Sequence, residues 1–324
     1  MEKSKLYNPQ YNNLPHKELE ALLLSLPEYD RRFVFLRFES FERFGMVTDT
    51  AIYKYDDAEF VFVPGNEVTL GWNDFAVGFD ETTASNIKEA FQELDMPFDE
   101  LDSFLQAQMS PVRRVTISPL LVERVPNDIG WRNVALDSPE LKPFEDRMKS
   151  FFQKGFGSFT LEKRMRINQK NGESVADIYE SISLDDFLAQ IHQSGFSLPT
   201  EDEWEYLCGG GTRTLFRWGD SFDYEMKLRY FSNNFAKDTP YTLEEPNQFG
   251  LSIAYDPYKY EVVENSEYFL KGGDGGYAIC GDYGMTLGYL PVATYFRSYS
   301  LSNDELGYQY DIGDDTFFRR LIRL

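Results

Sequence analysis

The run FSLPTEDEWEYLCGGGTRTLFRWGD, from Phe196 to Asp220, constrains the fold of this chain more than any other segment. Thr200 followed three residues later by Glu203 is a capping box, in which each side chain accepts a hydrogen bond from the backbone amide of the other residue. A helix is therefore expected to begin at this point. Trp204 and Leu207 can share its apolar face, and the three glycines that follow favour an early end and a turn.

The same run resembles the signature of the formylglycine-generating enzyme or sulfatase-modifying-factor domain, usually written R-L-P-T-E-A-E-W-E-Y-A, then a glycine pair, then W-G. Shorter segments are similar to other parts of that family's pattern: FVPGNEVTLG at 62–71, NQFGL at 247–251, KGGD at 271–274 and Phe-Arg at 318–319. Together they cover roughly residues 50 to 324. The resemblance implies an α+β protein with the irregular formylglycine-generating-enzyme (C-type-lectin-like) fold, built from short strands and long loops.

The expected organisation is an N-terminal extension at residues 1–48, which matches nothing in the family pattern, followed by a formylglycine-generating-enzyme-like domain at residues 49–324. In the extension, Leu19, Leu22, Leu23 and Leu26 fall at helical spacing and predict a docking helix with one buried stripe. Other expected elements are helices at 81–94 with Thr83 and Ser85 as candidate caps, at 98–108 and after Ser183, strands at 59–63 and 112–118, and a basic exposed hairpin or loop at 154–171.

The charge and cysteine content restrict the classes of partner and compartment. The chain has 324 residues, with 32 basic against 54 acidic side chains and a formal net charge of -22, so it is expected to repel the phosphates of nucleic acids. It has no apolar core typical of a signal peptide and no run of about 20 apolar residues, which argues against a membrane partner. Two cysteines are far too few for a disulfide framework. These features predict a cytoplasmic protein.

The enzymes of the resembled family oxidise a cysteine of a protein substrate to formylglycine, and two cysteines that follow the R-G-G-S segment hold the copper. In this chain only Cys280 lies in that region, and the one other thiol is Cys208. Because soft thiolates are the ligands that Cu(I) prefers, loss of one cysteine argues against copper and against formylglycine generation. Two inert thiols are favoured here, with a soft metal shared by Cys208 and Cys280 as the alternative.

The resemblance also places the glycine-rich turn at 271–276 on the floor of a cleft. Asp274, Tyr277 and Cys280 are therefore the candidate binding residues, with Cys280 also the one candidate for a catalytic role. Packing without any ligand is the alternative reading of the three side chains.

Histidine-based chemistry is not expected. A non-haem iron site needs two histidines and a carboxylate that converge on one metal, whereas this chain has only His16 and His192, far apart and without H-x-x-x-H spacing. A serine or cysteine nucleophile would need His192 as its base, and the glutamine-rich surroundings of His192 indicate an exposed helix end instead.

A structural calcium ion is the remaining inorganic possibility. Asn233, Asn234 and Phe235 occupy the place where the family begins one oxygen-rich calcium loop, and Glu261 is the acidic residue that survives in a second, altered loop. Calcium prefers carbonyl and carboxylate oxygens of this kind. No other cofactor is predicted.

The functional expectation is a bacterial-type member of the family that has lost the copper site and acts as a ligand-binding, peptide-binding or interaction module. A fold alone does not confer the activity of its relatives. One alternative is a metal-dependent oxidase of altered chemistry that uses Cys280, with Cys208 or an unusual ligand. The other is a structural subunit that docks on a partner protein through residues 1–48.

Overall fold

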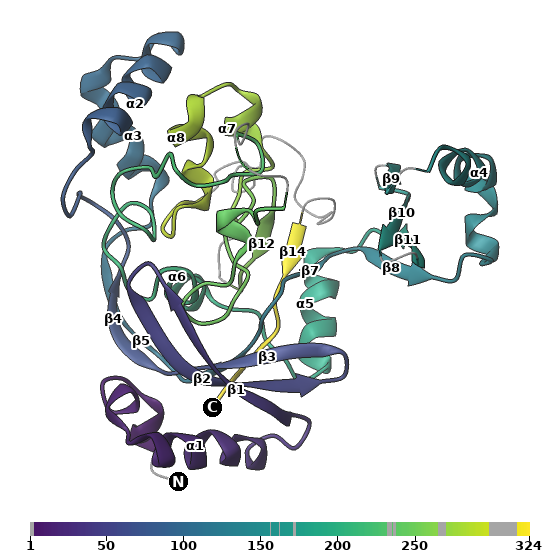
Figure 1. Ribbon diagram of the computed structural model, residues 1–324, viewed down its shortest axis with the longest axis horizontal. Coiled ribbons are helices and arrows are strands. Elements are labelled where there is room, and N and C mark those ends of the chain that lie inside the picture. The colour runs from purple at the N-terminus through teal and green to yellow at the C-terminus, as the bar shows by residue number, and fades with distance from the viewer. Residues whose placement is uncertain are drawn as a thin grey trace.

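The computed structural model describes residues 3–155, 157–161, 163–170, 173–231, 235, 238–264, 270–297 and 316–324. In this part of the chain helices and strands are mixed, as expected for an α+β protein. Figure 1 shows a main body built around a curved sheet, with helices above and below it and a small arm that projects to one side. Every helix among the described residues is too short or too polar to cross a lipid bilayer.

The main sheet has five strands, and every neighbouring pair in it is antiparallel. The last four residues of β3 are buried, because helices pack on both faces of the sheet there. The segment expected as a strand at 59–63 lies in β3. In spatial order the strands are β1 (Val34–Arg43), β2 (Met46–Tyr55), β3 (Ala58–Val63), β6 (Leu120–Glu123) and β15 (Leu321–Arg323).

One face of this sheet is covered by α1 (His16–Ser25) and α5 (Leu184–Gln193). The four leucines of the expected stripe are all buried against the sheet, and Tyr53 Oη donates a hydrogen bond of 2.7 Å to Leu23 O. The helix predicted after Ser183 is α5, and Ser183 is its cap, because its hydroxyl accepts from the amide of Asp186 at 3.1 Å. The expected docking helix thus docks on the sheet of its own chain, and the boundary expected at residue 48 falls inside β2.

The opposite face packs against α6 (Glu201–Gly209), the helix of the signature run. The predicted capping box is present: Thr200 Oγ1 accepts from the Glu203 amide at 3.2 Å, and Glu203 Oε2 accepts from the Thr200 amide at 2.8 Å. Trp204 is fully buried, and Gly210 ends the helix with φ of 63°, a left-handed conformation that glycine adopts without steric cost.

Four helices gather at the end of the body farthest from α1 (Figure 1). They are α2 (Glu81–Glu93), α3 (Leu101–Gln108), α7 (Tyr277–Cys280) and α8 (Gly284–Gly288). The predicted caps Thr83 and Ser85 are wrong, because the cap of α2 is Asp80, whose carboxylate accepts from the Thr83 amide at 2.7 Å. The antiparallel strands β4 (Asn66–Leu70) and β5 (Arg113–Ile117) lead to this end, with α2 and α3 in the connection between them, and β5 confirms the strand expected at 112–118.

A smaller sheet joins the ends of several loops inside the body. Its order is β13 (Leu270–Lys271), β12 (Tyr260–Val262), β14 (Thr316–Phe318) and β7 (Asn127–Asp128). Strands β12 and β14 are parallel, and the other two pairs are antiparallel. Since β14 continues into β15, this small sheet fixes the glycine-rich turn relative to the main sheet.

The projecting arm has a small core of its own. It contains α4 (Glu145–Lys154) and an antiparallel sheet in the order β8 (Trp131–Val134), β11 (Glu173–Tyr179), β10 (Met165–Lys170) and β9 (Ser158–Leu161). The hairpin or loop expected at 154–171 covers the end of α4 and the β9–β10 hairpin. Within it, Arg166 pairs with Asp128 at 2.6 Å and Asp177 at 2.7 Å, which ties the arm to β7.

Candidate functional site

A cleft of about 560 Å³ opens beside α7, between α3, α8 and the segment that follows α8. Its walls are mainly aromatic and aliphatic, and a few polar groups face into it, which is the usual composition of a ligand pocket. Asp274, Tyr277 and Cys280, the three predicted cleft residues, all line it. The aromatic and aliphatic wall consists of Phe104, Tyr260, Tyr283, Leu287, Leu290, Pro291 and Phe296.

The glycine-rich turn brings backbone and rings close together at the floor of the cleft. A Cβ atom on Gly273 would lie 2.3 Å from Lys259 O, and one on Gly276 would lie 2.1 Å from the ring of Tyr258. Gly276 also has φ of 79°. Glycine is required at both positions, so the segment forms the tight structural turn that its composition predicts.

Asp274 is held at the start of α7 by the backbone. Its Oδ2 accepts a hydrogen bond of 2.9 Å from the Ala278 amide, whereas its Oδ1 is buried without a hydrogen-bond partner among the described residues. Burial raises the pKa of this carboxyl above its ordinary value, although the amides of Ala278, Gly276 and Tyr277 act in the opposite direction. Asp274 therefore brings a partly desolvated carboxyl group to a mainly apolar cleft.

Cys280 is exposed and faces a tyrosine. Its Sγ lies 3.0 Å from Tyr258 Oη, and either group can be the donor. This hydrogen bond, with a smaller contribution from burial, raises the pKa of Tyr258 to about 12. Tyr277 stands at the mouth with 71% of its surface exposed and packs edge-on against Tyr283, with ring centroids 6.1 Å apart. The mouth of the cleft thus offers one accessible thiol among tyrosine rings.

Arg297 closes one side of the cleft and is fixed by a charged network behind it. Its guanidinium donates to both carboxylate oxygens of Glu201, at 2.7 and 2.6 Å. Lys271 lies 3.6 Å from Glu201 and 2.9 Å from Glu205, and the side chains of Lys271 and Glu205 are fully buried. Burial alone would raise the pKa of Glu201, but Arg297, Lys271 and Arg113 hold it below its usual value.

These network residues were missed at the sequence level. Glu201 lies in the run that predicts the helix start and Lys271 in the glycine-rich turn, and neither position by itself predicts an ion pair. The available signal was the density of carboxylates in the TEDEWE run, because acidic side chains on a helix that carries a buried tryptophan need basic partners from elsewhere. The partners themselves, at positions 113, 271 and 297, are distant in sequence.

Cys208 lies in a different environment from Cys280. It is fully buried in α6, and its Sγ is 3.8 Å from both Arg217 Nη1 and Thr294 Oγ1. Burial raises the pKa of the thiol, against a smaller opposite effect of the Arg217 charge. The two cysteines share none of these neighbours. Within the described ranges, no group of three or more histidine, cysteine, aspartate or glutamate side chains is arranged to hold a metal ion.

The candidate calcium residues do not come together in the described structure. Asn233 and Asn234 lie outside the described residues, and Phe235 is partly exposed. Both carboxylate oxygens of Glu261 accept hydrogen bonds from Arg319, at 2.6 and 2.7 Å, and Arg319 is itself fully buried. The charge of Glu261 is thus paired with the guanidinium of Arg319.

Both histidines have exposed side chains, and for His192 this confirms the sequence-based prediction. His16 Nε2 is 3.3 Å from Glu20 on α1, and His192 Nε2 is 2.9 Å from Glu264. Neither lines the aromatic cleft. This placement agrees with a surface role for both.

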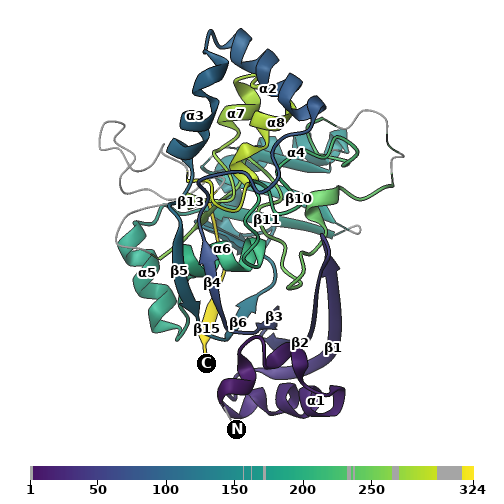
Figure 2. The ribbon, with the colours of Figure 1, turned by 90° about the vertical axis from the view of Figure 1, so that its left-hand side faces the viewer.

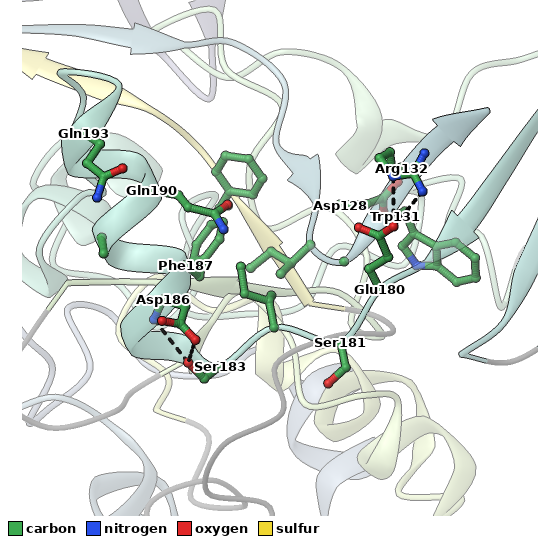
Figure 3. A pocket seen from close by; sticks show the side chains of 15 residues that line it. Asp128, Trp131, Arg132, Glu180, Ser181, Ser183, Asp186, Phe187, Gln190 and Gln193 are labelled. Carbon is green, nitrogen blue, oxygen red and sulfur yellow. Dashed lines mark hydrogen bonds and ion pairs between the residues drawn. The ribbon is translucent and has the colours of Figure 1, made fainter. Parts of the chain in front are cut away.

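Two other hollows have more polar walls. Figure 3 shows the first, about 550 Å³, between α5 and the start of the arm. On its two sides Ser183 is bonded to Asp186 and Arg132 to Glu180, so these groups already satisfy each other. The second, about 760 Å³, lies beside the β2–β3 turn, and there the carboxylate of Glu123 is paired with Arg320. Neither hollow contains a predicted site residue, so the aromatic cleft is the better candidate.

Comparison with known proteins identifies no family for this chain. No family model matches the sequence, and no curated protein is similar enough to be identified as a relative.

Proposed function

We propose that this chain is a divergent formylglycine-generating-enzyme-like protein, without formylglycine-generating activity, that binds an apolar or aromatic group of a ligand or peptide in the cleft beside α7. The observation that carries the proposal is the cleft itself: about 560 Å³, with a largely aromatic and aliphatic wall and a few polar groups. The family part of the proposal rests on the resemblance of the signature run, whose capped helix supplies Glu201 to the charged network behind Arg297.

The chemistry of the wall favours an apolar group with a hydrogen-bond donor or a positive charge. Tyr260, Tyr277 and Tyr283 offer ring faces and edges, on which apolar groups and cations bind. Asp274 adds a carboxyl oxygen that has no partner in the described structure. Arg297 is already engaged with Glu201, so it is a weaker attraction for an anionic group.

Binding is favoured over oxidation because the two thiols are in unlike states. A soft metal requires thiolates that converge on one ion. Cys280 is exposed beside Tyr258, whereas Cys208 is enclosed in the core with a raised pKa. An accessible thiol in an apolar cleft is suited to contact a bound group, and a buried thiol of raised pKa is suited to packing.

The test obstructs the cleft by chemical modification of Cys280. A library of small aromatic and aliphatic fragments is screened for binding by saturation-transfer NMR, with untreated protein and with protein alkylated by N-ethylmaleimide. Alkylation is expected at Cys280 and not at buried Cys208, so it places a bulky group in the cleft wall and should weaken fragment binding. The matched control is Cys280→Ser, which has no reactive thiol in the cleft and is expected to bind the same fragments after the same treatment.

Two results would overturn the proposal. One is that no fragment binds, or that alkylation of Cys280 leaves fragment binding unchanged. The other is catalysis: if the protein consumes oxygen with a cysteine-containing peptide, and Cys280→Ser abolishes that turnover, the metal-dependent oxidase is the correct reading.

A further inference from the structure

The two edge strands of the main sheet, β15 and β1, differ in how far their backbones are paired. At one end, the backbone of Leu321 in β15 exchanges hydrogen bonds of 3.1 and 2.9 Å with Ser197, so this edge is covered. At the other end is β1, a strand of ten residues that pairs with β2 alone among the described strands. Figure 2 shows β1 on the outside of the molecule, with no other element drawn beyond it. An open edge strand presents a row of backbone groups that can pair with another strand.

Part of β1 exposes large apolar side chains at this edge. Val34, Leu36 and Phe38 are 62%, 40% and 38% exposed, although all three are large and apolar. Edge strands that remain unpaired are often very short or carry proline, charged side chains or a bulge; β1 is ten residues long and has no proline or lysine, although it carries arginines, glutamates and one bulge. A bulge between Phe35 and Arg37 is its one irregularity, and from Arg37 to Arg43 the pairing with β2 is regular. Phe38 and its two neighbours Arg37 and Glu39 lie in this regular part, next to the bulge.

The sequence of β1 is complementary to itself. Arg37 is opposite Ile52 and Glu39 is opposite Thr50, so both charged side chains lie on the same face of the sheet, with Phe38 on the other. If a second β1 runs antiparallel to the first with the two Phe38 residues opposite each other, Arg37 of each copy lies opposite Glu39 of the other. Registers centred on Arg37 or on Glu39 place like charges opposite each other, which is unfavourable.

We propose that this chain forms a two-fold symmetric dimer in which β1 pairs with β1 of a second copy, centred on Phe38. The two five-stranded sheets then continue into one another, as in other complexes formed by strand addition. The backbone supplies the hydrogen bonds, the Phe38 pair buries exposed apolar surface, and the two Arg37–Glu39 pairs select the register. The inference is independent of the cleft, because no residue of β1 lines it.

The proposed register can be tested by reversing the charge at position 37 or 39. Glu39→Arg places arginines opposite arginines in the dimer, and Arg37→Glu places glutamates opposite glutamates. Each variant alone is expected to be a monomer. Mixed in equal amounts, they should form a heterodimer, because one copy then carries two arginines and the other two glutamates at the facing positions. The association is measured by sedimentation velocity over a concentration series at physiological ionic strength, since the net charge of -22 on each copy repels at low salt.

The test has two controls. Val77→Lys changes another exposed apolar residue, 92% accessible and remote from β1 in sequence, and is expected to leave the dimer unchanged. Circular-dichroism melting shows that both charge variants stay folded. In the monomer Arg37 makes ion pairs of 2.8 Å with Glu39 and 2.7 Å with Glu59, all with substantially exposed side chains, so their loss should shift the melting temperature little.

The proposal predicts a dimer for the wild type, monomers for the two separate variants and restored association in the mixture. A wild type that stays monomeric at every concentration overturns it. So does a dimer that survives both substitutions, because that dimer uses another surface, and so does a mixture that stays monomeric although each variant is folded.

Discussion

Replacing Arg319 by methionine is expected to destabilise the protein strongly, because it leaves a buried carboxylate without its counter-ion. Arg319 is fully buried and binds both oxygens of Glu261 in β12, at 2.6 and 2.7 Å. It also donates to the backbone oxygens of Glu123 at 3.2 Å and Ser252 at 2.7 Å. One guanidinium therefore connects the small sheet, the main sheet and a loop of the body.

The expected cost follows from burial. Removing one partner of a buried ion pair costs about 3 to 5 kcal/mol, because the remaining charge stays in a poorly solvated site. Small domains are stable by only about 5 to 15 kcal/mol, so this loss is a large fraction of the total. Replacing both partners, as in Arg319→Met with Glu261→Gln, removes the uncompensated charge and should recover part of the loss.

The assay is urea unfolding of the wild type and the variants, followed by circular dichroism. The matched control is Lys149→Met, which removes a pair of 2.7 Å with Glu145 on the exposed face of α4. Both members of that pair are open to solvent, so the control should change the unfolding midpoint much less. The reasoning is refuted if Arg319→Met and Lys149→Met have the same small effect, or if the double variant is less stable than Arg319→Met.

Three further results are expected. A thiol reagent should label one cysteine of the native protein rapidly, Cys280, and should reach Cys208 only after unfolding; rapid labelling of two thiols would contradict the burial of α6. Asp274→Asn should stabilise the protein relative to the wild type, increasingly so as the pH rises from about 4 toward 7. The pKa of Asp274 is raised in the folded protein, so the stability that its carboxyl contributes is complete below the unfolded pKa of about 3.9 and is lost as the pH rises through the folded pKa. Melting temperatures of both proteins over this pH range test the sign, and a constant difference would refute it. Leu23→Ala should lower the unfolding free energy by about 2 to 5 kcal/mol, since Leu23 is buried between α1 and the sheet, and a loss below about 1 kcal/mol in urea unfolding would show that α1 is not part of the folded unit.

Local features of the fold could be predicted from the sequence because the residues that determine them are neighbours. The capping box at Thr200 and the leucine stripe of α1 each lie within a few turns of chain, and both occur as expected. The surface on which the leucine stripe packs could not be predicted in the same way. Its partner is the sheet of its own chain, including Tyr53, and an apolar stripe has the same sequence whether it faces its own domain or another protein.

The cleft shows the same limit more clearly. Asp274, Tyr277 and Cys280 could be named together because they lie on one turn and the short helix after it. The opposite wall comes from α3 and from the segment after α8, and no local pattern brings Phe104 and Phe296 to the same cavity. The charged wall behind it depends on pairs such as Lys271 with Glu205, which are 66 positions apart.

The most direct test of the central claim is the rate at which a thiol reagent labels Cys280 in the presence of the fragments that bind. If the cleft holds them, the labelling rate should fall in proportion to occupancy and approach zero at saturation, because the bound group covers the only thiol in the cleft wall. The labelling rate of unfolded protein is the control, and it should not depend on the fragments. An unchanged rate for native Cys280 at saturating fragment would show that binding occurs elsewhere and would contradict the account.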